Sequence, residues 1–226
     1  MVDLLWGRDG KRSRGPRPVL TVAQIVEAAV AMADAEGLPA VTMQRLAERF
    51  GYTAMSLYRY VPKRTDLVTL MIDTALGTAP PLDASAGWKP ALRTWATRLH
   101  AVFGEHPWLA TATMQARPIG PKELSWLERA AAALAGTGLT GPQRVDAALV
   151  VLGHVRAQVQ AAAGIAAEEG AALAATLNEL LREHAGDYPA LIEASAFGPA
   201  AHDGFAFGLD CILDGIEART AVDPLS

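Results

Sequence analysis

The chain has 226 residues, of which 51% are apolar and 6% aromatic, and its formal net charge is −4. This length is enough for one large or two small domains with a sizeable core. Alanine is abundant, which favours packed helices over sheets, because alanine is the best helix former and is depleted in strands. The single cysteine, Cys211, excludes a disulfide framework and a cysteine-based zinc site and is consistent with a reducing compartment. No signal peptide or membrane span is evident, so we expect a cytoplasmic protein.

Positive charge is concentrated near the start of the chain. Residues 1–77 carry 10 Lys or Arg and 8 Asp or Glu, whereas the remaining residues carry 10 and 16, so the two parts have net charges of +2 and −6. Between residues 40 and 65, Glu48 is the only acidic residue, and the basic residues are Arg45, Arg49, Arg59, Lys63 and Arg64. A basic segment on an acidic body is typical of a nucleic-acid contact, although a solvated face gives the same balance.

The first 77 residues predict an arm followed by a small helical domain. We expect residues 1–18 to be a flexible basic arm, because Gly and Pro interrupt the cluster of Lys11, Arg12, Arg14 and Arg17. These side chains could reach a minor groove or remain disordered. Helical apolar spacing and capping residues then predict helices at about 21–36, 42–50, 53–61 and 63–76, within a domain spanning residues 19–77.

Residues 77–87 contain two adjacent prolines and no helical pattern, which indicates a link between domains. The second domain is expected over residues 88–220. Its predicted helices lie at about 90–105, 107–116, 122–135, 142–168, 171–185, 189–197 and 201–220, several of them opening on a proline. No alternating strand pattern occurs, so the predicted fold is all-α.

Two short helices joined by a glycine turn and flanked by longer helices are the plan of a helix-turn-helix. In this motif the second short helix lies in the major groove, so it exposes small or polar side chains at its start. The sequence supplies Thr53, Ala54, Met55 and Ser56 at that position. They are followed by side chains that suit phosphate oxygens, namely Tyr58, Tyr60, Lys63 and Arg64.

At these residues the chain resembles a known family. Residues 20–76, with the segments TMQRLA (42–47), FGY (50–52) and SLYRYV (56–61), are similar to the DNA-binding region of the tetracycline-repressor (TetR) family. Residues 205–217, FAFGLDCILDGIE, resemble the last helix of the tetracycline-repressor C-terminal domain. The resemblance implies an N-terminal three-helix helix-turn-helix domain and a C-terminal domain for ligand binding and dimerisation. It implies a repressor that binds palindromic operator DNA as a homodimer and is released by a small molecule.

The resemblance also implies roles for individual residues. Thr42 and Gln44 would approach DNA from the first short helix, and Thr53, Ala54 and Met55 would meet base edges. Because Met55 lacks a hydrogen-bonding group, it would contact a thymine methyl group rather than read a donor pattern. Phosphates would be held by Tyr58, Tyr60 and Arg64. Simple packing is the alternative for both tyrosines, and Gln44 could be an ordinary exposed helix residue.

In this family the C-terminal helices form a ligand cavity and the last long helices pair in a dimer. Small and apolar residues along the final predicted helix fit such pairing: Gly204, Phe205, Gly208, Cys211, Ile212 and Gly215. Burial within one chain is the alternative. The candidate cavity residues are Trp95, Leu99, Phe103, Trp108 and Met114, with His154 and Gln158 as polar anchors. They predict a largely apolar, aromatic effector bound without metal, although an ordinary core would have the same composition.

Other motifs carry less weight. Gly136, Gly138 and Gly141 spell G-x-G-x-x-G, but they follow an alanine-rich helix instead of a strand, so we interpret them as a loop. The histidine spacings do not suit a metal site, and Cys211 has no neighbouring base, so we expect no cofactor and no catalytic residue. The alternative function is an all-helical enzyme or small-molecule binding module with an incidental basic segment. An enzyme would not need the pattern between residues 42 and 64.

Overall fold

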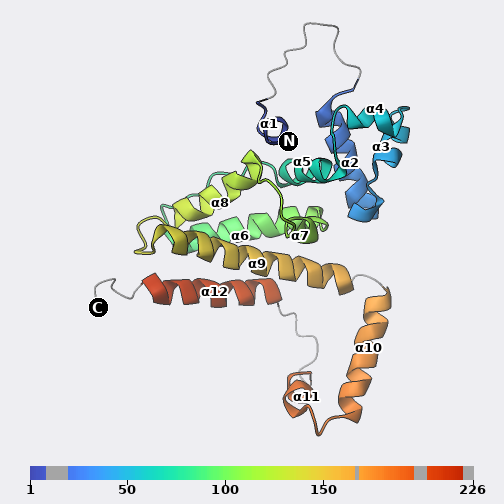
Figure 1. Ribbon diagram of the computed structural model, residues 1–226. Helices are drawn as coiled ribbons and strands as arrows, with labels where there is room; N and C mark the ends of the chain where they lie inside the picture. The colour runs from blue at the N-terminus through green and yellow to red at the C-terminus, as the bar shows by residue number, and fades with distance from the viewer. Residues whose placement is uncertain (9–19, 166–167, 196–202, 221–226) are drawn as a thin grey trace.

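The computed structural model describes residues 1–8, 20–165, 168–195 and 203–220, and these residues form helices and turns without a strand (Figure 1). The predicted all-α fold is confirmed. Most helix ends lie within a few residues of the predicted ones. The largest difference is the helix predicted over residues 107–116, which is only α7, Leu109–Ala112. Pro118 stops a helix from extending past residue 116, but it does not explain why the helix already ends at Ala112.

Threonine side chains cap three of the helices in the N-terminal part. This part contains α2 (Val22–Glu36), the short 3₁₀ turn η1 (Leu38–Ala40), α3 (Met43–Arg49), α4 (Ala54–Tyr58) and α5 (Arg64–Leu76). Thr21, Thr42 and Thr53 each accept a hydrogen bond from the backbone N–H three residues later, which satisfies one of the unpaired donors at a helix start. Between α3 and α4, Gly51 has a φ of 70°, a left-handed conformation that favours glycine.

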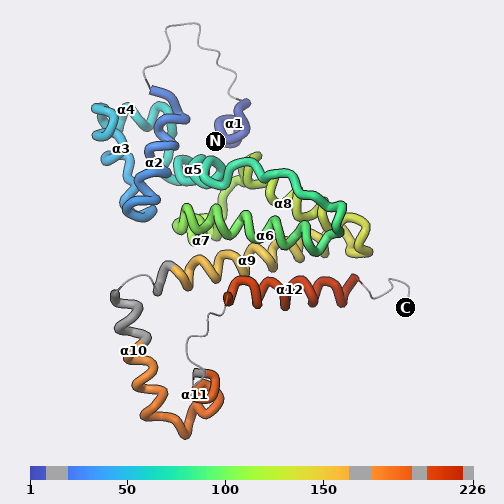
Figure 2. Tube along the Cα trace, turned by 180° about the vertical axis from the view of Figure 1, so that it is seen from behind, coloured from blue at the N-terminus to red at the C-terminus, as the bar shows by residue number. Residues whose placement is uncertain are grey.

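The C-terminal part consists of stacked helices with a projecting pair. The helices are α6 (Trp88–Glu105), α7, α8 (Pro121–Ala133), α9 (Gly141–Ile165), α10 (Glu168–Glu183), α11 (Pro189–Ser195) and α12 (Gly204–Thr220). The long α9 packs against α6, α8 and α12. Figures 1 and 2 show α8 and α12 on opposite sides of this stack, with α10 and α11 extending away from it.

The prediction of an irregular arm over residues 1–18 is wrong at its start. Val2–Leu5 form a short helix, α1, and Leu5 is buried against the common apolar core together with the partly buried Met1 and Leu4. Burial of these apolar side chains outweighs the glycines and prolines farther along. The basic cluster of the arm, Lys11 to Arg17, lies outside the described residues.

Two carboxylates of the N-terminal part bind the C-terminal part. Asp73 of α5 is buried and accepts hydrogen bonds from the backbone N–H groups of Lys122 (2.9 Å) and Glu123 (3.1 Å) in the first turn of α8. Asp34 of α2 accepts a bond from the indole N–H of Trp108 (2.7 Å) and lies 2.8 Å from Nδ1 of His106. One continuous core also joins the two parts. Because Asp73 joins α5 to the first turn of α8, a displacement of that turn would be transmitted directly to α5.

Candidate nucleic-acid interface and ligand cavity

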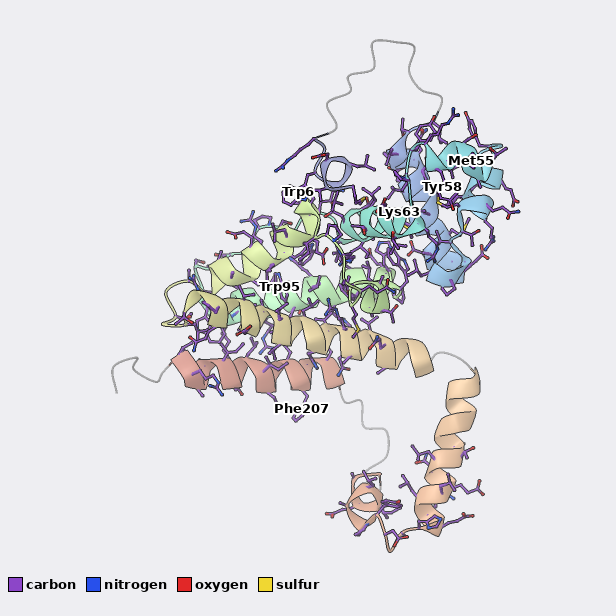
Figure 3. The ribbon with its side chains drawn as sticks, viewed as in Figure 1. Trp6, Met55, Tyr58, Lys63, Trp95 and Phe207 are labelled. Carbon is purple, nitrogen blue, oxygen red and sulfur yellow. The ribbon has the colours of Figure 1, made fainter. Side chains whose placement is uncertain are left out.

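The outer side of α3 and α4 is the candidate nucleic-acid interface. Leu46, Ala47 and Leu57 bury the inner sides of the two helices, so the opposite sides face outward. Met55 is 75% exposed and Tyr58 is 40% exposed, and Figure 3 places both at the edge of the N-terminal part, away from the stack around Trp95. Of the predicted DNA-contact residues, those with exposed side chains are Thr42, Gln44, Thr53, Met55, Tyr58, Lys63 and Arg64. Ala54, Ser56 and Tyr60 are half-buried.

Local hydrogen bonds fix side chains on the outer side of α3 and α4. The hydroxyls of Thr53 and Ser56 lie 3.0 Å apart at the start of α4, and the Gln44 amide donates to Glu48 at 3.1 Å. Tyr60 packs against the core, which agrees with the packing alternative for this tyrosine. The Tyr58 hydroxyl, by contrast, belongs to an exposed side chain and is open to a partner.

The basic residues of this segment divide into two groups. Arg45 pairs with Glu36 at 2.9 Å, and the Arg64 guanidinium donates to the carbonyls of Val41 (2.9 Å) and Leu38 (3.1 Å). These two arginines brace the turn around η1, so Arg64 has a structural role that the sequence did not reveal. The other group has no ion pair among the described residues and is exposed: Arg49, Arg59 and Lys63.

A cavity of about 290 Å³ lies between α6, α8, α9 and the chain that joins α7 to α8. Its apolar wall includes Trp95, Leu99 and Phe103 of α6 and Trp126 of α8. The indole N–H of Trp95 donates to the Trp126 carbonyl at 2.8 Å, and the indole N–H of Trp126 donates to the Gly77 carbonyl at 3.0 Å. Because both indole donors are satisfied by the backbone, these rings present an apolar surface to the cavity.

The polar side of the cavity was not predicted. It contains Arg117, Glu123 and Arg156 together with Thr113 and Gln115. The Arg117 guanidinium makes two bonds to the Glu123 carboxylate, at 2.6 and 2.7 Å, whereas Arg156 Nε donates to the Thr113 hydroxyl at 3.1 Å. The sequence signal for Arg156 is its position inside an apolar helical run, because an arginine is seldom buried unless it is paired.

Four predicted cavity residues do not line this cavity. Trp108 is buried, but its indole binds Asp34 at the junction with α2. Met114 is 68% exposed. His154 and Gln158 lie on the side of α9 that faces α12, where Gly204 and Gly208 approach them. The predicted residues of α6 line the cavity, whereas the prediction named no residue of α8, and apolar composition could not tell which side of α9 faces the cavity.

Half of the predicted dimer residues instead contact their own chain. Phe205 stacks between the rings of His100 (4.2 Å between centroids) and His154 (5.6 Å), and its carbonyl lies 2.9 Å from His154 Nε2. Gly208 also faces the His154 ring, and Gly204 faces Gln158. Gly204, Phe205 and Gly208 are therefore half-buried against their own chain, as the alternative expects, and their part in a dimer stays a prediction.

The other predicted dimer residues lie along an open groove. Cys211, Ile212 and Gly215 of α12 line it together with Ala147 and Val150 of α9. Cys211 and Gly215 are exposed, and so are Val150 and Phe207. Figure 3 shows Phe207 pointing away from the helical stack. This apolar strip is the remaining candidate for contact with a second copy.

Two negative findings concern the described residues alone. None of their helices is both long enough and apolar enough to cross a membrane. They contain no group of three or more His, Cys, Asp and Glu side chains that could hold a metal ion.

Comparisons with known proteins agree with this architecture. Residues 25–71 match the family model described as bacterial regulatory proteins, tetR family, and residues 79–220 match the tetracyclin repressor-like C-terminal domain. The chain is 37% identical to the HTH-type transcriptional repressor DrrR1 of Streptomyces coeruleorubidus, over 97% of this chain and 86% of that protein. It is 33% identical to an HTH-type transcriptional regulator of Saccharopolyspora erythraea, over 83% and 79% of the two chains.

Solved structures give the same result. The TetR family protein ActR of Streptomyces coelicolor, crystallised in complex with actinorhodin, superimposes with a TM-score of 0.77 at 26% identity, covering 91% of this chain and 100% of that one. Family models match both parts of the chain, and a repressor with more than a third of identical residues aligns over nearly its whole length. The chain therefore belongs to the tetR family of bacterial regulatory proteins.

Proposed function

We propose that this protein is a repressor that binds palindromic operator DNA as a homodimer and leaves it when a small molecule fills the cavity between α6, α8 and α9. The outward face of α3 and α4, with the exposed Met55 and Tyr58, is the observation that carries the proposal. An enzyme or binding module has no use for such a face. The proposal places the protein in the cytoplasm, with the bacterial chromosome, and assigns it no catalytic residue.

On the DNA side, α4 enters the major groove. Thr53, Ala54, Met55 and Ser56 stand at the start of α4, which is where a recognition helix meets base edges, while Thr42 and Gln44 approach from α3. Phosphate contacts come from Tyr58 and Lys63 and from two basic residues that the sequence prediction did not single out, Arg49 and Arg59. Tyr60 and Arg64 contribute by holding the domain together.

On the opposite side of the stack, α9 and α12 pair with the same helices of a second copy. Val150, Cys211, Ile212 and Gly215 form the described centre of this interface. The projecting helices support the pairing, because Leu177, Leu180 and Leu191 are about half exposed there and a second copy would cover them. A two-fold dimer places two recognition helices on successive turns of one duplex face.

Control by a ligand follows from the connection between cavity and DNA domain. The Glu123 side chain lines the cavity, and the Glu123 backbone N–H binds Asp73 of α5. A ligand that displaces the first turn of α8 therefore moves α5 and changes the distance between the two recognition helices. The ActR complex with actinorhodin supports a small-molecule ligand for a chain of this fold. By this mechanism the ligand shifts the population away from the DNA-binding conformation.

The experiment that tests the proposal is selection of bound duplexes from a random DNA pool by the full-length protein. We expect enrichment of a palindrome whose half-sites lie about 10 base pairs apart, centre to centre. Enrichment of a non-palindromic site would contradict the homodimer, and a pool without any enriched sequence would contradict DNA recognition.

Two substitutions on α4 are expected to separate base reading from phosphate contact. Met55→Ala removes an apolar contact to a base edge, so it should change the preference at one base pair of each half-site, by about 1 kcal/mol. Tyr58→Phe removes a hydroxyl from a phosphate contact, so it should weaken binding to all operator variants to a similar extent. Affinities for a set of single-base operator variants provide the measurement. A uniform loss for Met55→Ala together with a base-specific change for Tyr58→Phe would refute these roles.

Val150→Arg is expected to weaken the dimer at least about tenfold, because its guanidinium would lose its hydration at the centre of the interface, and a pair with Asp146 one turn earlier on α9 would not restore that loss. Sedimentation equilibrium over a range of protein concentrations measures this change. The matched control is Ala132→Arg on α8, an exposed position on the opposite side of the stack. Equal dimer stability in the two variants would place the interface elsewhere.

A further inference from the structure

The cavity contains more positive than negative charge. Three of the side chains that line it are ionised, namely Arg117, Glu123 and Arg156. Glu123 is already occupied by Arg117, in an ion pair whose side chains are 9% exposed on the arginine and 20% exposed on the glutamate. For Arg156, the described hydrogen-bond partner is a neutral hydroxyl, that of Thr113. The three residues leave one cationic charge without a carboxylate of its own.

This arrangement is costly without a ligand. Burial lowers the pKa of Arg156 below its ordinary value, Glu123 counteracts this shift, and the positive charge of Arg117 adds to it. An arginine nevertheless remains protonated at neutral pH, so the charge stays. In addition, the buried Nε of Arg117 has no hydrogen-bond partner among the described residues. Buried cations and buried donors are normally paired, because leaving them unpaired loses their hydration without replacement.

We propose that the effector is an aromatic carboxylate whose acid group binds Arg156, an inference that rests on the ligand-controlled function proposed above. The guanidinium is a planar fork of donors that matches a carboxylate in geometry and charge. The aromatic body lies against Phe103 and against the indoles of Trp95 and Trp126, whose N–H donors the backbone already satisfies. A cavity of about 290 Å³ is at the small end of ligand sites, which suits two or three fused rings.

This assignment changes what the sequence alone predicts. With His154 and Gln158 as anchors, a largely uncharged effector was expected. Those two residues face α12 instead, and the polar side of the cavity includes three charged side chains. A small charged metabolite without rings would still leave the apolar wall empty, so both features of the ligand are required.

The experiment compares acids with neutral isosteres of the same shape. Isothermal titration calorimetry with the full chain measures binding of 2-naphthoate and anthraquinone-2-carboxylate, each beside its carboxamide. We expect at least one acid to bind at least about tenfold more tightly than its amide, because the amide cannot form the ion pair with the half-buried Arg156. An amide that binds as tightly as its acid, or the absence of binding by both acids, would overturn the proposal.

Two variants that should change the affinity for the acid in opposite directions test whether Arg156 binds the acid group. Arg156→Gln should remove the preference for the acid, whereas the control Arg129→Gln, the same charge change at an exposed position on α8, should leave it intact. Glu123→Gln should instead strengthen binding of the acid several-fold and leave the amide unaffected, since it removes the competing carboxylate. A merely structural role for these side chains would not produce an increase in affinity. An acid preference that survives Arg156→Gln would overturn the assignment of Arg156.

Failure of this inference can be told apart from failure of the proposed function. Binding of the selected operator duplex by the ligand-free protein tests the repressor, and it requires no ligand. If the duplex binds while the acid preference is absent, the effector class is wrong and the repressor stands. If the acids bind with the expected preference and no duplex is bound, the cavity assignment stands and the repressor does not.

Discussion

Replacing Gly208 with leucine is expected to lower the free energy of unfolding by about 3 kcal/mol, because the site is too crowded for any side chain. A Cβ atom at Gly208 would overlap the imidazole of His154, approaching to 2.9 Å from Nε2 and 3.0 Å from Nδ1. The ring has little freedom to retreat, since Nε2 lies 2.9 Å from the Phe205 carbonyl and the ring stacks on Phe205. Leucine would therefore separate the start of α12 from α9.

Urea unfolding at a fixed protein concentration measures this effect, since a dimer's stability depends on concentration. Gly104→Leu is the matched control, because Gly104 is also a helical glycine and a Cβ atom there meets nothing within 4 Å. Adding His154→Ala to Gly208→Leu should recover part of the loss by removing the obstructing ring. Equal stability of the Gly208 and Gly104 variants would show that α12 does not pack on α9 in this way.

Asp73→Ala is expected to cost about 2 kcal/mol and to weaken communication between the cavity and the DNA-binding helices. The substitution leaves the backbone N–H groups of Lys122 and Glu123 without their acceptor at the start of α8. Unfolding experiments measure the first effect. The second is the ratio of operator affinities without and with a saturating effector, which should move towards one. A ratio equal to that of the wild type would show that the signal does not pass through Asp73.

Asp73→Asn provides the control, because the amide oxygen can still accept both N–H bonds. Burial raises the pKa of the Asp73 carboxyl above its ordinary 3.8, an effect that the two backbone N–H donors partly oppose. A raised pKa means that the folded protein favours the protonated form. The protonated Asp73 carboxyl therefore contributes to the stability of the fold. This contribution is complete at a pH below the pKa that Asp73 has in the unfolded chain, and it is lost as the pH rises through the higher pKa of the folded protein. Relative to the wild type, Asp73→Asn should therefore gain stability as the pH rises through that window.

The DNA-binding half of the molecule could be predicted from sequence because its signals are local. Thr42 caps its helix as expected, Gly51 makes the turn, and Leu46 and Leu57 are buried at helical spacing. Each of these features depends on residues only a few positions apart. The exception is Arg64, whose carbonyl partners lie more than 20 residues earlier in the chain.

The cavity and the pairing surface could not be predicted as well, because they depend on which sides of distant helices meet. Small residues at Gly204 and Gly208 do mark a close helix contact, but the sequence could not say whether the neighbour was a second copy or α9 of the same chain. The same uncertainty explains why His154 was assigned to the cavity. Arg156 stands in an apolar run, and the sequence does not show that its side of α9 faces a cavity.

The affinity of the wild-type protein for the selected operator duplex, measured by fluorescence anisotropy as a function of salt, tests the central claim most directly. Arg49, Arg59 and Lys63 would displace counterions from phosphates. We therefore expect the affinity to fall at least about tenfold between about 50 and about 200 mM salt, with operator preferred over random duplex throughout. An affinity that does not change with salt, or that is equal for operator and random DNA, would contradict sequence-specific binding of DNA through the face of α3 and α4.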